Sequence, residues 1–334
     1  MNILYEFLIP KKMNNTLDRF RGAWLGSMLG SSIELRKGVG KAYRHENNDT
    51  LLQFFIVREQ LAEIAIESQT LNAEAIADLL VERKPMGDRS SVLAEYSYCL
   101  LSLLPLIIFY GDNWNLLEKI VRKYCLKLGS LSNSLELEAD TLLWSYLITS
   151  IFHSGLELNG RHFSQSIGQI LNKMAVKKTA LIGQLEIVIT AIERGVSLEQ
   201  LSDELLPRGN SVQRAIALSC YCFATTATDF KLSVQRASNI DPEIAKLATA
   251  LTGTVSGAYN GMARIPLSWK KMAKQDTAYS LASQTTLKLF RAWLGVHPVG
   301  NELSSNIENQ AIAIPSLIQT RKTLKIISQK SLFN

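Results

Sequence analysis

Residues 19–30 of the chain read RFRGAWLGSMLG, and residues 250–261 read ALTGTVSGAYNG. In both stretches a glycine recurs at every fourth residue, which places the glycines of each stretch on one face of a helix. Glycine inside a helix costs about 1 kcal/mol relative to alanine, so its repetition indicates that something approaches the backbone closely. We favour tight packing of these helices in the core, with close approach to a ligand as the alternative.

The remainder of the chain also has a helical pattern. Apolar residues recur at steps of three and four, which places them on one helix face. This spacing predicts helices over 50–67, 73–84, 92–109, 114–128, 138–154, 163–175, 179–194, 211–227 and 277–291. Convincing strand patterns are scarce, and no Asn-Gly or Asp-Gly turn separates two alternating runs. The sequence therefore predicts an all-α fold, a single globular multi-helix domain of about a dozen helices.

Two helix ends carry clear signals. Ser197 and Gln200 have the spacing of a capping box, and Gly195 is placed to end the preceding helix. The segment 241–243, Asp-Pro-Glu, is the strongest helix start in the chain. It combines an acceptor side chain for the N-cap, a proline in the first turn and an acid near the positive end of the helix.

No linker or shift in composition divides the chain, which predicts one domain. Residues 1–12, MNILYEFLIPKK, are apolar and then basic, the reverse of a secretory signal peptide. We interpret them as an N-terminal extension that is absent if translation starts at Met13, and residues 13–334 as the domain. The longest apolar run, 98–110, is shorter than the ~20 residues of a transmembrane helix. We therefore expect a soluble, cytoplasmic protein with no membrane partner.

Charge and cysteine content exclude further classes. Lys and Arg number 36 against 30 Asp and Glu, but both signs are spread along the chain, which argues against a nucleic-acid partner. The cysteines at 99, 125, 220 and 222 lack the spacing of a zinc site, so we expect buried thiols in a reducing compartment. The acids Glu136, Glu138 and Asp140 precede a predicted helix, and we interpret them as charges that favour its N-terminus.

The two glycine-rich stretches resemble the ends of the ADP-ribosylglycohydrolase family. RFRGAWLGSMLGSSIE, from residue 19, is similar to that family's opening helix, usually RFRGALLGLAVGDALG. ATALTGTVSGAYNGMARIPLSWK, from residue 248, is similar to its closing signature of a small-residue helix, Ile-Pro and Trp. The resemblance implies an all-α globule with two Mg²⁺ ions in a cleft, which hydrolyses the bond between ADP-ribose and an acceptor. Oxygen ligands suit such hard cations.

The family's early metal motif, Thr-Asp-Asp-Thr, is matched only in part. Its closest counterpart is the segment 47–50, Asn-Asn-Asp-Thr, which keeps Asp49 and Thr50. The Asp that follows the third glycine of the family's opening helix is Ser31 in this chain. As an alternative to a metal ligand, Asp49 has the position of an N-cap for the predicted helix 50–67.

The late motif, Asp-x-Asp-Thr, is matched less well. Counting back from Gly253 places its two aspartates on Ile244 and Lys246, neither of which offers an oxygen ligand. A shift of three residues brings Asp241 and Glu243 into a comparable pair, although helix capping explains both residues equally.

These substitutions predict a degenerate member of the family. We expect a protein whose binuclear Mg²⁺ site is largely lost and whose catalysis is impaired or absent, but which retains binding of ADP-ribose or a nucleotide. The residues expected in the ligand cleft are Asp49, Thr50, Asp241, Glu243, Gly257 and Tyr259, with Asp49 and Asp241 as metal ligands. The alternatives are an active Mg²⁺-dependent ADP-ribosyl hydrolase and a helical interaction scaffold without a ligand. The expected partner is an ADP-ribose-like molecule or an ADP-ribosylated protein, and no catalytic residue is assigned.

Overall fold

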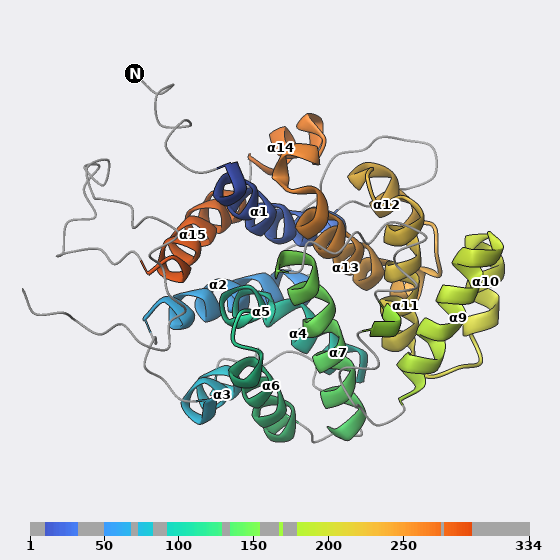
Figure 1. Ribbon diagram of the computed structural model, residues 1–334, viewed down its shortest axis with the longest axis horizontal. Helices are drawn as coiled ribbons and strands as arrows, with labels where there is room; N and C mark the ends of the chain where they lie inside the picture. Colours follow the sequence, from blue (N-terminus) through green and yellow to red (C-terminus); the bar gives the residue numbers. More distant parts are fainter. Residues whose placement is uncertain are drawn as a thin grey trace, which may run out of the picture.

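The computed structural model describes residues 11–32, 50–67, 73–82, 92–128, 134–153, 167–169, 179–274 and 277–295. Within these ranges the chain forms helices and no strand, which confirms the predicted all-α fold (Figure 1). The helices follow in this order: α1 (Lys11–Ser32), α2 (Thr50–Glu67), α3 (Ala73–Glu82), α4 (Val92–Ser102), α5 (Leu104–Tyr110), α6 (Trp114–Leu128), α7 (Ser134–His153), α9 (Ala180–Arg194), α10 (Leu198–Leu205), α11 (Ser211–Thr225), α12 (Phe230–Ala237), α13 (Pro242–Asn260), the 3₁₀ helix η1 (Met262–Arg264), α14 (Leu267–Ala273) and α15 (Thr277–Trp293). None of these described helices is both long and apolar enough to span a bilayer.

The predicted helix over 92–109 is wrong in one respect, because the chain forms two helices there. α4 ends at Ser102 and α5 begins at Leu104, with Pro105 in its first turn. Proline has no N–H for a helix hydrogen bond and its ring crowds the preceding turn, so it suits the start of a new helix. Helices α12 and α14 were not among the predicted ranges. Most of the predicted helix 163–175 lies outside the described residues.

The predicted helix ends are confirmed. Ser197 accepts a hydrogen bond from the backbone of Gln200, whose side chain accepts one from Ser197 in return. Gly195 ends α9 in the left-handed conformation, at a φ of 65° that favours glycine. Asp241 is the N-cap of α13 and accepts a hydrogen bond from the N–H of Glu243 at 3.0 Å.

The two glycine-rich helices, α1 and α13, pack against each other in antiparallel directions (Figure 1). Gly22 lies against Gly257, Gly26 lies against Gly253, and Gly30 lies against the backbone of Thr249. A Cβ atom on any of the α1 glycines would overlap a carbonyl oxygen of α13. The glycines therefore serve close packing of two helix backbones, which is the interpretation that the sequence favoured.

A large apolar core surrounds this helix pair. Phe20 of α1 makes edge-to-face contacts with Phe152 of α7 and with Phe290 and Trp293 of α15, at centroid distances of 5.2–5.6 Å. These contacts join the two ends of the described chain to its middle. α3 packs against α6, and α11 packs against both α9 and α13. All four cysteines are buried thiols, as the sequence predicted.

Candidate functional site

The start of α13 holds the residues that were compared with the late metal motif. The Oδ2 atom of Asp241 accepts a hydrogen bond from Nη2 of Arg214 at 2.8 Å, and the Arg214 side chain is 9% exposed. Glu243 is exposed, and Ile244 points into the core with no exposed surface. Lys246 follows, also exposed. Asp241 is thus engaged by a cation from α11 and by its own helix.

The structure does not describe how the residues of the early motif lie relative to Asp241 and Glu243. Asp49 lies outside the described residues, and Thr50 is the first residue of α2 with a side chain that is not described. Ser31, which replaces the family's aspartate, is buried and donates from its hydroxyl to the carbonyl oxygen of Met28 at 2.8 Å. A metal role for Asp49 stays a prediction.

The two cleft candidates near the end of α13 have packing contacts. Gly257 lies against the backbone of Gly22 in the α1–α13 contact. Tyr259 is half-buried, and its ring meets that of Phe223 edge to face at 5.5 Å. Between Asp241 and Gly261 the helix rises about 30 Å, at 1.5 Å for each residue, so Asp241 and Tyr259 lie near opposite ends of α13.

A magnesium ion requires about six oxygen ligands in near-ideal geometry. Within the described part of the chain, no three His, Cys, Asp or Glu side chains are grouped closely enough to hold a metal. At the start of α13, Arg214 already supplies a positive charge to Asp241, and a second cation would compete with it. Asp241, the described candidate ligand, is thus paired with an arginine and with the N-terminus of its own helix.

A buried carboxyl group was misinterpreted from the sequence. Asp140 of α7 has no exposed surface, and Nε2 of Gln213 donates to its Oδ2 at 2.7 Å. Burial raises the pKa of Asp140 to about 6, although the hydrogen bond from Gln213 opposes this shift. Its neighbour Glu138 pairs with Arg122 of α6. Glu138 and Asp140 thus pair with side chains of other helices, and of the three acids only Glu136 lies in the first turn of α7, as the sequence suggested.

A buried arginine was also missed. Arg58 of α2 has no exposed surface, and its Cζ lies 4.6 Å from the ring centroids of both Trp24 and Phe55. The adjacent Glu59 accepts a hydrogen bond from Nε1 of Trp24 at 2.8 Å. Burial lowers the pKa of Arg58 to about 10, with the Glu59 charge opposing the shift, so Arg58 remains a cation at pH 7. This Arg-Glu pair stands inside an apolar helical run, but the sequence alone does not show whether its partners are water or distant side chains.

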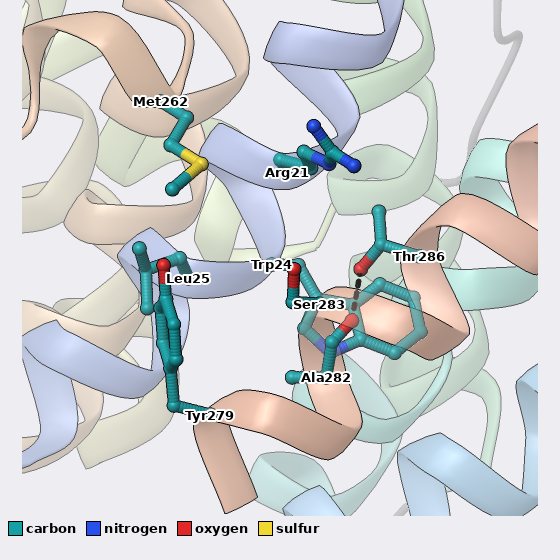
Figure 2. Close-up of a pocket in the computed structure, with 8 residues that line it drawn as sticks. All are labelled: Arg21, Trp24, Leu25, Met262, Tyr279, Ala282, Ser283 and Thr286. Carbon is teal, nitrogen blue, oxygen red and sulfur yellow. Dashed lines mark hydrogen bonds between the residues drawn. The ribbon is translucent and has the colours of Figure 1, made fainter. Parts of the chain in front are cut away.

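A small pocket lies between α1, η1 and α15 (Figure 2). Its walls are formed by Arg21, Trp24, Leu25, Met262, Tyr279, Ala282, Ser283 and Thr286. Its inner volume is about 10 Å³, which is room for roughly one water molecule, and it is open to solvent on one side. The hydroxyl of Thr286 is already used, because it donates to the carbonyl oxygen of Ala282 at 2.6 Å.

Comparison with known proteins places this architecture in a class. No protein-family model and no curated protein matches the sequence. A solved structure described as an ADP-ribosylglycohydrolase-related protein complex is similar to the chain at a TM-score of 0.51. The match covers 85% of this chain and 100% of that one, at 16% sequence identity. The chain thus has an ADP-ribosylglycohydrolase-like fold, and at this identity the similarity concerns the fold alone.

Proposed function

We propose that this protein is a catalytically impaired relative of the ADP-ribosylglycohydrolases that retains binding of an ADP-ribose-like ligand. The observation that carries the proposal is the pairing of Asp241 with Arg214 at 2.8 Å. Asp241 is the one aspartate near the late-motif position, and its carboxylate is satisfied by an arginine and by the helix N-terminus. Ligand binding is inferred from the similarity of fold and from the glycine-rich motifs at both ends.

Two further positions support impaired catalysis. Counted without gaps, the family's late aspartates fall on Ile244 and Lys246. Ile244 is packed in the core, where it offers neither an oxygen atom nor access to solvent. Lys246 carries a positive charge, which would repel a divalent cation close to it. Hydrolysis through paired ions needs oxygen ligands at such positions.

Calorimetric titration and a hydrolysis assay test this proposal together. ADP-ribose is titrated into the protein with and without millimolar Mg²⁺, and release of ADP-ribose from ADP-ribosyl-arginine is followed under the same conditions. We expect binding that does not depend on Mg²⁺, and no release above that of the matched variants Asp49→Asn and Asp241→Asn.

Mg²⁺-dependent hydrolysis that both variants abolish would establish an active hydrolase instead. Absence of ADP-ribose binding by folded protein would leave the interaction scaffold as the better description. A cytoplasmic location and an ADP-ribosylated protein as the partner are part of the same proposal, and pull-down with an ADP-ribosylated protein against its unmodified form tests the partner.

A further inference from the structure

We infer that the pocket between α1, η1 and α15 is an anion-binding site. It would bind a phosphorylated ligand with one phosphoryl oxygen inside the pocket. Met262 in the wall of the pocket is separated from Asp241 by the full length of α13, about 30 Å. The pocket therefore does not include the candidate metal ligand Asp241, and none of the residues predicted for the ligand cleft lines it, so the inference does not depend on the proposed function.

The donors around the pocket suit an oxyanion. Arg21, Tyr279 and Ser283 surround the same hollow, and the two hydroxyls point from α15 toward α1 and η1 (Figure 2). The Nε–H of Arg21 is buried and has no hydrogen-bond partner among the described residues. Guanidinium and hydroxyl groups can all donate to phosphate oxygens, and hydrogen bonds from a charged donor are about twice as strong as neutral ones.

The protonation state of Tyr279 agrees with a donor role. Burial raises its pKa, and the nearby charge of Arg21 only partly opposes this shift. Tyr279 therefore keeps its proton at neutral pH. The size of the pocket is also suitable, because a volume of about 10 Å³ admits one water-sized oxygen while the rest of the phosphoryl group stays at the open side.

Positive charge is concentrated on the segments that contribute to this pocket and on α14, which follows η1. Three segments are concerned: α1 from Thr16 on, the stretch from Met262 to Lys274, and α15. Together they carry eight basic residues, which are Arg19, Arg21, Arg264, Lys270, Lys271, Lys274, Lys288 and Arg291. Asp18 is the one acid among these described residues, and Asp276, between α14 and α15, lies outside them. These segments thus contain eight of the chain's 36 Lys and Arg residues but, among the described residues, only one of its 30 Asp and Glu residues. The remaining residues contain 28 basic and 29 acidic side chains, so they have no net positive charge.

Asp18, the one described acid among these residues, has a structural role at the turn from α13 into η1. Its Oδ2 accepts a hydrogen bond from the N–H of Ala263 at 3.4 Å and lies against Gly261, where the chain turns from α13 into η1. On the other side, Nζ of Lys270 donates to the carbonyl oxygen of Met262 at 3.2 Å, which holds a second cation beside the pocket wall. Such a concentration of like charge attracts anions to the site.

Titration with inorganic phosphate, pyrophosphate and ADP-ribose at constant ionic strength tests the inference. We expect saturable binding of phosphate or pyrophosphate, with Kd on the order of 1 mM or tighter. Arg21→Met should weaken this binding by at least about tenfold, and Tyr279→Phe should weaken it by about threefold. Lys288→Met removes the same charge from α15 at an exposed position that does not line the pocket, and should change Kd by less than about twofold.

Each variant is first checked for an unchanged circular dichroism spectrum and thermal midpoint, and Tyr279→Phe serves if Arg21→Met does not fold. Saturation by none of the three probes would overturn the inference. Equal losses in Arg21→Met and Lys288→Met would also overturn it, because they would indicate a diffuse field and no pocket. If ADP-ribose still binds to Arg21→Met, that binding is due to another site and belongs to the proposed function. If ADP-ribose binds more tightly than phosphate and this binding requires Arg21, the ligand of the pocket is a larger phosphorylated molecule.

Discussion

Gly26 of α1 and Gly253 of α13 touch through their backbones, and a Cβ atom built on either residue would overlap the carbonyl oxygen of the other. No side-chain rotation can relieve this overlap, because both partners are main-chain atoms. The contact recurs one turn away on each side, between Gly22 and Gly257 and between Gly30 and Thr249. The distance between the two helices is therefore fixed by the absence of side chains at these positions.

Replacement of Gly26 by alanine should consequently destabilise the protein. We expect Gly26→Ala to lower the free energy of unfolding by about 3 kcal/mol, because the helices must separate to admit one methyl group. Gly183→Ala is the matched control: Gly183 lies within α9, is exposed, and has no atom within 4 Å of an added Cβ. That control should gain up to about 1 kcal/mol from helix propensity. Urea unfolding measures both, and similar small effects for the two variants would refute the packing argument.

Much of this architecture follows from local sequence pattern. The predicted bounds of α2 and α6 are those observed, because each is an apolar run that repeats at steps of three and four. Close packing of the two glycine-rich helices in the core was also predicted from glycine spacing, whereas their contact with each other was not. The break at Pro105 was overlooked, although proline by itself indicates the start of a new helix.

The polar features of the interior could not be predicted in the same way. Asp140 is buried because Gln213, distant in the sequence, donates a hydrogen bond to it. Arg58 is buried because the rings of Trp24 and Phe55 lie beside it. A charged residue looks the same in the sequence whether its partner is water or a distant side chain, so its burial depends on the tertiary fold. The same holds for the pocket, which three separate segments form.

The four thiols should be unreactive in the folded protein. Cys99, Cys125, Cys220 and Cys222 are all buried, and burial raises the pKa of both Cys220 and Cys222 to about 12. Because the thiolate is the reactive form, an aromatic disulfide reagent at pH 8 should label none of them within minutes. The same reagent in denaturant should label all four. Rapid labelling of native protein would contradict the burial of these helices.

Arg58 and Glu59 should be energetically coupled. Glu59→Gln keeps an acceptor for Nε1 of Trp24 but leaves the buried Arg58 cation without its neighbouring carboxylate, so we expect a loss of about 3 kcal/mol. The double variant with Arg58→Met should lose less than the sum of the single variants, with a coupling of at least about 1 kcal/mol.

The surface pair of Glu118 and Arg122 is the control for this cycle. Their side chains are 2.8 Å apart and 34% and 45% exposed, and an exposed pair four residues apart on a helix contributes about 0.5 kcal/mol or less. Thermal and urea unfolding of the variants give both couplings. A coupling between Arg58 and Glu59 no larger than that of the surface pair would show that the buried charges do not stabilise each other.

The carboxyl group of Asp140 should make stability depend on pH. Its pKa is about 6 in the folded protein against 3.8 for the unperturbed group. Between these values the folded state holds the proton and the unfolded state does not, so this group's contribution to stability falls as the pH rises from about 4 to 6 and is constant above. The difference corresponds to about 3 kcal/mol.

Asp140→Asn resembles the protonated form of this carboxyl group and can still accept the hydrogen bond from Gln213. The variant should therefore be more stable than the wild type at pH 7 by up to about 3 kcal/mol, and it should lose this advantage near pH 4. The same substitution at the exposed Asp203 of α10 should leave the difference from the wild type constant over this range to within about 0.5 kcal/mol. Urea unfolding at half-unit steps of pH measures all three proteins, and an Asp140→Asn variant that is less stable than the wild type at pH 7 would mean that the ionised carboxylate is favoured by its surroundings.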